Sequence, residues 1–112
     1  MKKIEAIVRP SKLEPLKEAL LKFGIKGLTV SEVHGCGNQL GWKEYFRGSE
    51  VIVNMRPKVK FEIITADESV EELTKVIINT AKTGEVGDGK IFVYPVEEVI
   101  RIRTEESGEV AI

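Results

Sequence analysis

The order of two hydrophobic patterns along the chain limits its fold more than any other feature. Some segments alternate apolar with polar residues or are rich in β-branched and aromatic residues, as strands are, and others carry apolar residues at helical spacing. These patterns predict strands over residues 3–8, 28–36, 59–64 and 91–96, and helices over residues 11–23 and 69–81. A further short extended piece is expected over residues 100–103.

Short motifs mark the ends of the two predicted helices. Ser11 with Glu14, and Ser69 with Glu72, have the spacing of a capping box, in which the two side chains bond to free backbone N–H groups. Gly24 is expected to close the first helix because glycine adopts a left-handed conformation at no steric cost.

The resulting order, β-α-β-β-α-β, predicts an α+β fold. We expect a ferredoxin-like sandwich with one antiparallel sheet and two helices on one face. Since two helices cover only one face, the other face is expected to be covered by further copies of the chain, which makes it a homo-oligomer.

The length of 112 residues favours a single domain, and the composition is that of an ordinary globular protein without a strong excess of acidic or basic residues. The net charge of −1 gives no basic field for nucleic acid or for an anionic membrane. One cysteine and one histidine rule out an internal disulfide and a four-cysteine zinc site. No apolar run reaches the roughly 18 residues that span a bilayer, so a cytoplasmic protein is expected.

A glycine-rich tract over residues 83–90, T-G-E-V-G-D-G-K, precedes the last predicted strand. Glycines let backbone N–H groups approach a ligand closely, and Lys90 adds a positive charge, so the tract suits a phosphate. It is not a P-loop, because Ile91 stands where that motif needs Ser or Thr and a strand follows instead of a helix. The alternative is a helix C-cap at Gly84 followed by a tight turn.

Other polar residues are expected near this tract. The end of the second strand, residues 35–39, should lie close to residues 87–90, and the amide oxygen of Gln39 suits a magnesium ion bound to phosphates. Arg101 and Arg103 would point to one face of an extended segment and suit a polyphosphate, unless they form a solvated edge with nearby glutamates. Lys58 would pair with a carboxylate ligand, unless it is an isolated exposed lysine that serves only solubility.

Residues 37–56 are too long for an ordinary hairpin turn and carry side chains typical of partner surfaces, Trp42, Tyr45, Phe46 and Arg47. The alternative is a β-hairpin extension with its own small apolar cluster that includes residues 51–53.

Four tracts together resemble the PII signal-transduction proteins, the nitrogen-regulatory family, over the whole chain. They are M-K-K-I-E-A-I-V-R-P at the start, R-G-S-E at 47–50, T-G-E-V-G-D-G-K-I-F-V at 83–93 and V-I-R-I-R-T at 99–104. The resemblance implies a homotrimer that binds ATP or ADP between neighbouring subunits. It also implies 2-oxoglutarate and Mg²⁺ as effectors, and a long loop that acts on an ammonium transporter or on an enzyme or regulator of nitrogen metabolism.

The resemblance also assigns roles to matching residues. It implies a T-loop over about 37–56, a phosphate-binding B-loop over about 83–90 and a C-terminal segment over about 98–112. Gln39 would hold magnesium and, with Gly41 and Lys58, 2-oxoglutarate. The residues implied for the nucleotide are Thr29, Gly35, Gly37, Asn38, Gln39, Glu62, Ile64, Gly87, Asp88, Gly89, Lys90, Arg101 and Arg103.

The chain departs from many relatives at two places. Val51 stands where they carry a tyrosine that is uridylylated, and valine has no hydroxyl to modify. Asn38 stands where arginine is frequent, which removes a cation beside the nucleotide. Ser49 matches a serine that is phosphorylated in some relatives.

Two other classes fit part of the sequence. A small ATP-hydrolysing or phosphotransfer enzyme would share the phosphate tract but needs a catalytic base. An RNA-recognition module shares the β-α-β-β-α-β order but needs aromatic residues on its central strands. A regulator that binds ligands without catalysis is therefore the favoured function.

Overall fold

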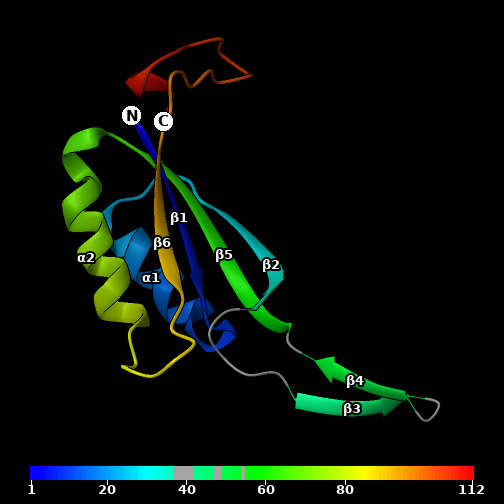
Figure 1. Cartoon of the computed structure of the whole chain (residues 1–112). Helices are drawn as coiled ribbons and strands as arrows, with labels where there is room; N and C mark the ends of the chain where they lie inside the picture. Colours follow the sequence, from blue (N-terminus) through cyan, green and yellow to red (C-terminus); the bar gives the residue numbers. More distant parts are fainter. Residues whose placement is uncertain (37–41, 47–48, 54) are drawn as a thin grey trace.

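A four-stranded antiparallel sheet with both helices on one face forms the body of the protein (Figure 1). The computed structural model describes residues 1–36, 42–46, 49–53 and 55–112. The sheet order is β2-β5-β1-β6, with β1 Lys2–Val8, β2 Thr29–Gly35, β5 Arg56–Thr65 and β6 Lys90–Pro95. The helices are α1 Leu13–Phe23 and α2 Val70–Ala81. This arrangement confirms the predicted ferredoxin-like α+β fold.

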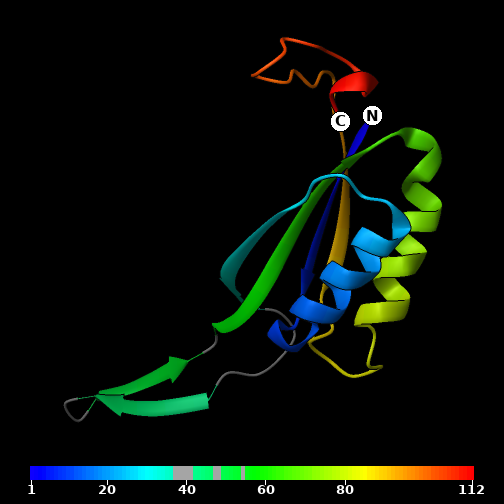
Figure 2. The ribbon, with the colours of Figure 1, turned by 180° about the vertical axis from the view of Figure 1, so that it is seen from behind.

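The core lies between the sheet and the helices, which Figure 2 shows side by side on one face. Alternate residues of the two central strands point into it, because successive side chains of a strand face opposite sides of the sheet. Each fully buried Leu, Ile or Phe side chain contributes about 1.5–3 kcal/mol to folding stability, because its apolar surface is removed from water. The largest of them are Phe61, Ile4, Leu16, Leu20, Ile63, Leu73 and Ile77.

The helix ends agree only in part with the sequence. Gly24 closes α1 with a φ of 108°, as predicted, and donates its N–H to the last turn of the helix. Both capping boxes were wrong: α1 begins after Lys12, and neither helix has a side-chain cap bond. The reason is that a 3₁₀ turn precedes each helix, η1 Pro10–Lys12 and η2 Asp67–Ser69, so the chain enters the helix through backbone bonds instead.

The end of α2 excludes one interpretation of the glycine-rich tract. The helix stops at Ala81, and Lys82 is already extended, with φ −70° and ψ 129°. Gly84 has a φ of 91° but lies beyond this end, so it is not a helix cap. The positive φ belongs to the loop itself.

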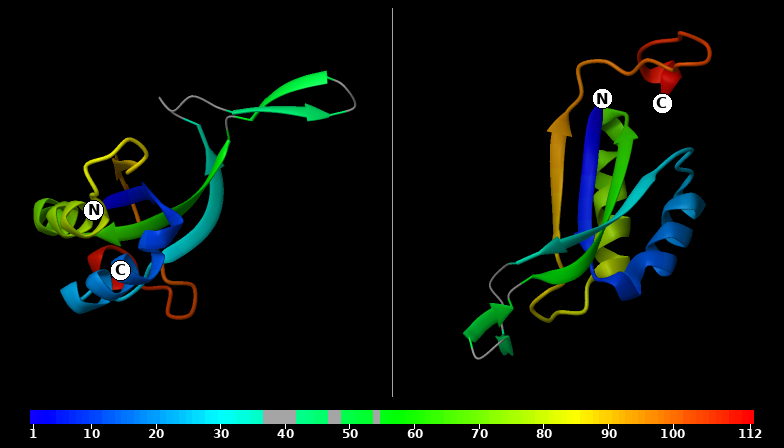
Figure 3. Two further views of the ribbon diagram at one scale, coloured as in Figure 1. Left: turned by 90° about the horizontal axis from the view of Figure 1, so that it is seen from below. Right: turned by 90° about the vertical axis from the view of Figure 1, so that its right-hand side faces the viewer.

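Residues 37–56 contain a two-stranded antiparallel hairpin of β3 Trp42–Phe46 and β4 Ser49–Val53. The hairpin extends beyond the end of the main sheet that carries the last residues of β2 and the first of β5 (Figure 3). This agrees with the predicted alternative of a hairpin extension. The small apolar cluster expected within it concerns side chains outside the described part of the structure.

The sheet face opposite the helices carries a mixture of charged and apolar side chains. Lys3 Nζ lies 3.7 Å from carboxylate oxygens of both Glu5 and Glu62, and 4.9 Å from the centre of the Tyr94 ring. Phe92 and Tyr94, on the edge strand β6, are 40% and 41% exposed on this face. In a single chain this face therefore presents large aromatic surface to water.

The C-terminal segment differs from its prediction. Ile100 makes an isolated bridge to Ser107, and residues 102–104 form a turn that is closed by a bond from Glu105 N–H to the Arg101 carbonyl. The extended piece predicted over 100–103 was therefore wrong, since the following polar and glycine-containing residues turn the chain back on itself. The segment ends in a short 3₁₀ turn, η3 Glu109–Ala111.

Candidate functional site

The carboxylate of Asp88 organises the glycine-rich loop between α2 and β6. It accepts hydrogen bonds from the backbone N–H groups of Thr83 and Gly84, both at 2.9 Å, and from the Thr83 hydroxyl. The Thr83 bonds, first from its hydroxyl and then from its backbone, hold the pKa of the Asp88 carboxyl far below its usual range. Asp88 is thus ionised at neutral pH, and its side chain points back into the loop.

Two further contacts fix this loop against strand β1. Arg9 donates from a terminal guanidinium nitrogen to the Val86 carbonyl at 2.8 Å and from Nε to the Asp88 carboxylate at 3.2 Å. Gly89, with a φ of 102°, lies so close to Ile7 that a Cβ there would be 1.7 Å from the Ile7 carbonyl oxygen. Only glycine fits at position 89, for both conformational and steric reasons.

Lys58 joins the loop from strand β5. Its ammonium group donates to the Gly87 carbonyl at 2.7 Å. Burial lowers the pKa of Lys58, and the neighbouring cations Arg9 and Arg56 lower it further. A partly buried cation that neighbours other cations is well suited to binding an anion.

A cavity of about 510 Å³ lies beside the loop, within the size range of small-molecule sites. The loop residues Gly87, Asp88, Gly89 and Lys90 line it together with Gly35, Cys36 and Lys58. The predicted approach of the second strand's end to the glycine-rich tract is confirmed for Gly35 and Cys36. Gly37, Asn38, Gln39 and Gly41 lie outside the described residues.

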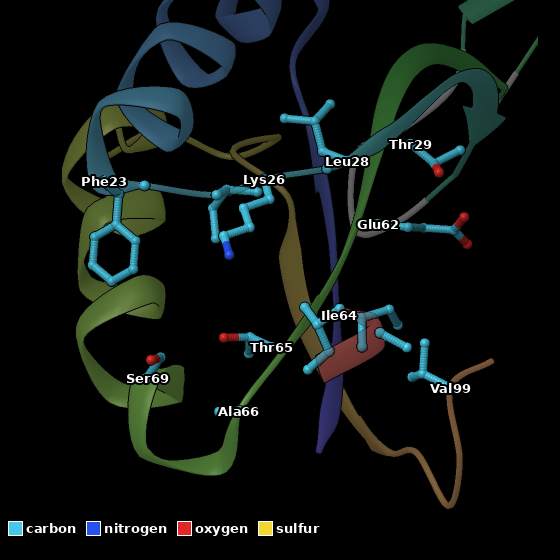
Figure 4. A pocket seen from close by; sticks show the side chains of 15 residues that line it. Phe23, Lys26, Leu28, Thr29, Glu62, Ile64, Thr65, Ala66, Ser69 and Val99 are labelled. Carbon is cyan, nitrogen blue, oxygen red and sulfur yellow. The ribbon is translucent and has the colours of Figure 1, made fainter. Parts of the chain in front are cut away.

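Thr29, Glu62 and Ile64, the residues expected beside adenine, line a second cavity of about 600 Å³ (Figure 4). Val99 and the C-terminal residues Ala111 and Ile112 line it too.

The two cavities lie toward opposite ends of the sheet. Thr29 pairs with Glu62, whereas Gly35 pairs with Arg56. At about 3.3 Å per residue, the two ends of β2 are roughly 20 Å apart. One chain thus carries the two halves of the expected nucleotide site, but it does not bring them together.

The two arginines of the C-terminal segment lie in different surroundings. Arg101 forms an ion pair with Glu106 at 3.2 Å and also donates to the Val110 carbonyl. Arg103 is exposed in the turn at 102–104. Neither residue lines the two cavities described above.

The expected partner residues fall in and around the hairpin. Trp42, Tyr45 and Phe46 belong to β3, and Ser49 begins β4. Arg47 lies outside the described residues. Within the described ranges, no three His, Cys, Asp or Glu residues gather as metal ligands, and no helix is both long and apolar enough to cross a bilayer.

Arg9 was not predicted as a site residue, and Thr83 was included only as the first residue of the glycine-rich tract. Arg9 directly follows the strand predicted over residues 3–8 and precedes Pro10, so its place in the sequence indicates only the end of a strand. The signal that would have found it is the register of β1 and β6, in which Ile7 pairs with Lys90. Continued by two residues, this register brings position 9 opposite position 88.

The chain matches the family described as Nitrogen regulatory protein P-II over residues 1–106. Proteins named Nitrogen regulatory protein P-II from Pasteurella multocida and Rhizobium meliloti are each 55% identical to it over 112 residues, which cover all of both chains. The Escherichia coli protein named Nitrogen regulatory protein P-II 1 is 53% identical over the same full length. Because the match spans nearly the whole chain at this identity, the chain belongs to the P-II family of nitrogen regulatory proteins.

Proposed function

We propose that the protein signals nitrogen, carbon and energy status by binding ATP or ADP together with 2-oxoglutarate. The observation that carries this proposal is the glycine-rich loop, which is shaped by Asp88 and lies beside a cavity of ligand size. Its glycines leave backbone N–H groups accessible to phosphates, and Lys90 adds a cation at its exit.

The proposed nucleotide site lies between two copies of the chain. A second copy that brings its Thr29, Glu62 and Ile64 to the first copy's glycine-rich loop would join the two halves. Such a contact is head-to-tail, because it joins two different surfaces of the chain. Every copy completes both of its half-sites only if the copies close into a ring. A homotrimer is the ring we propose, and it would also cover the aromatic surface of Phe92 and Tyr94.

The remaining ligand contacts follow from the family. We propose that Gly35, Gly37 and Asn38 lie beside the nucleotide, and that Arg101 and Arg103 reach its phosphates from the neighbouring copy. Arg101 donates to Glu106 and to Val110, and its remaining N–H donors would contact the phosphate. Mg²⁺ usually binds to phosphates with one or two protein oxygens, and Gln39 would supply one of these.

Lys58 gives a physical reason for coupling between 2-oxoglutarate and ATP. We propose that 2-oxoglutarate binds Gln39, Gly41 and Lys58, so its carboxylate would share the ammonium group that also donates to the Gly87 carbonyl. Binding one ligand would thereby change the loop that receives the other. By thermodynamic linkage, each ligand must then change the affinity for the other by the same factor.

We propose that the hairpin transmits the state of the ligand site to a partner protein. Along the chain it lies between β2, which ends at Gly35, and β5, which carries Lys58 near its start, so ligand contacts at these residues would lie close to both ends of the hairpin segment. We propose that residues 37–56, including Trp42, Tyr45, Phe46 and Arg47, dock on an ammonium transporter or on an enzyme or regulator of nitrogen metabolism. The protein would act in the cytoplasm and reach the membrane only through a transporter.

Isothermal titration calorimetry tests the coupling. ATP with Mg²⁺ should tighten 2-oxoglutarate binding by a factor within about 5–150, and 2-oxoglutarate should tighten ATP by the same factor. Lys58→Gln should weaken 2-oxoglutarate strongly and ADP far less. Independent binding of the two ligands would contradict the proposed coupling. A purified chain that remains monomeric and binds no adenine nucleotide would contradict the proposed function as a whole.

The two other classes receive no support from the described residues. The open face of the central strands β1 and β5 carries Lys3, Glu5, Ile7, Lys60, Glu62 and Ile64, and base stacking needs aromatic residues there. The relatives are named as regulatory proteins. A phosphate-release assay with ATP, in which we expect slow or no turnover, tests the enzymatic alternative directly.

A further inference from the structure

We propose that Arg9 is a positioning residue of the phosphate site, which holds the glycine-rich loop in the shape that receives a nucleotide. This inference rests on the proposed function, because it assumes that the loop binds phosphate. It assigns to Arg9 a role that acts through the loop instead of through a contact with the ligand.

The register of the sheet places Arg9 where it can do this. β1 lies between β5 and β6, and its residues pair with both neighbours. The pair Val8–Val59, continued by one residue, places Arg9 opposite Lys58. The pair Ile7–Lys90, continued by two residues, places Arg9 opposite Asp88. Arg9 therefore lies between Lys58 and Asp88. A central strand is held from both sides, so its last residues form a rigid base for a neighbouring loop.

The two Arg9 bonds reach two loop residues, Val86 and Asp88, that lie outside strand β6. One bond goes to the Val86 carbonyl at 2.8 Å, and the other goes to the Asp88 carboxylate at 3.2 Å. The side chains of Arg9 and Asp88 are only 28% and 24% exposed, so water screens their ion pair less than it would at an open surface. The planar guanidinium presents several donors in a fixed geometry, which a lysine cannot match.

Asp88 connects Arg9 with the rest of the loop. The carboxylate that Arg9 contacts is the same one that accepts the N–H groups of Thr83 and Gly84. Loss of Arg9 would remove the ion-pair partner of this anion and the Arg9 bond to the Val86 carbonyl. The loop would then keep its inner bonds and the Lys58 bond to Gly87, but it would lose two of the contacts that hold it against the sheet.

The test compares Arg9→Gln and Arg9→Lys with Lys22→Gln, which removes one positive charge from α1, away from the loop. Two measurements are made on each full-length protein. The first is the dissociation constant of ATP by calorimetry. The second is amide hydrogen exchange of Thr83 and Gly84 without ligand, which reports the shape of the loop alone.

Arg9→Gln should weaken ATP binding about tenfold or more, a loss of about 1.4 kcal/mol, because the loop would no longer be held in the shape that receives the phosphates. It should also speed exchange at Thr83 and Gly84 in the free protein. Arg9→Lys should fall between, and Lys22→Gln should behave as the unaltered chain.

Each other outcome contradicts a distinct statement. Weakened ATP with unchanged exchange would make Arg9 a direct phosphate ligand and overturn the positioning role. Unchanged ATP affinity in Arg9→Gln would overturn it as well. If the unaltered chain binds no ATP, the proposed function fails, whereas faster exchange in Arg9→Gln would still show that Arg9 holds the loop.

Discussion

Replacing Gly89 with alanine tests whether its close approach to β1 fixes the glycine-rich loop. The added Cβ would lie 1.7 Å from the Ile7 carbonyl oxygen and 2.8 Å from the carbonyl carbon. To reach 3.0 Å from the oxygen, the backbone must move by about 1.3 Å. The Ile7 carbonyl belongs to a central strand that is paired on both sides, so the loop has to move instead.

Two costs add in this variant. Forcing extra volume into a tight contact costs about 1–3 kcal/mol. A residue with a Cβ in a left-handed conformation costs about 1–2 kcal/mol more. The free energy of unfolding should therefore fall by about 2–5 kcal/mol, which lowers the melting temperature by about 8–20 °C for a domain of this size.

Gly84→Ala is the matched control. Gly84 also has a positive φ, 91°, but a Cβ there meets nothing within 4 Å. Only the conformational cost of about 1–2 kcal/mol applies. Urea unfolding of both variants at one protein concentration separates the two costs, since association also shifts apparent stability. Equal midpoints for Gly84→Ala and Gly89→Ala would refute the argument that the contact with Ile7 fixes the loop.

Two further predictions concern the loop's charge and the core. Because the pKa of the Asp88 carboxyl is lowered in the folded protein, the ionised carboxylate stabilises the fold at neutral pH, and this contribution is lost as the pH falls below about 4. The difference in unfolding free energy between the unaltered chain and Asp88→Asn should therefore become smaller in unfolding curves measured at acid pH. Leu16→Ala, at a fully buried position, should cost about 2–5 kcal/mol in urea unfolding. Leu21→Ala, at a residue that is 55% exposed, should cost within about 0.5 kcal/mol. A pH-independent Asp88→Asn difference, or similar costs for the two leucines, would contradict these arguments.

Periodicity alone carried most of the fold prediction. The alternation over residues 3–8 and 59–64 identified the two central strands, and the helical spacing identified both helices, because burial on one face imposes these periods. Gly24 marked a helix end correctly, since the left-handed conformation there excludes most other residues.

The errors lie where several local structures use the same residues. Ser11 and Ser69 can cap a helix or sit in a preceding 3₁₀ turn, and the structure has the turn in both cases. The segment at 100–103 has the apolar alternation of a strand, but the later residues fold back and pair with Ile100.

The candidate site was predictable where one tract holds its residues together. The glycine-rich loop is local, so its sequence was sufficient to locate it. Arg9 lies 79 positions from Asp88 along the chain, and only the strand register brings them together. The separation of Thr29 from Gly35 follows from the strand predicted over residues 28–36, whereas the pairing of these residues with Glu62 and Arg56 depends on the strand register.

The separation of the two proposed half-sites would have a genetic consequence. In the proposed ring of three chains, a protein that lacks a working loop and a protein that lacks a working Thr29–Glu62–Ile64 cavity would each be inactive alone. Mixed in one ring in either proportion, they restore one seam, formed by the intact half of each. Co-expressed defective alleles should therefore complement one another, whereas two alleles damaged in the same half should not.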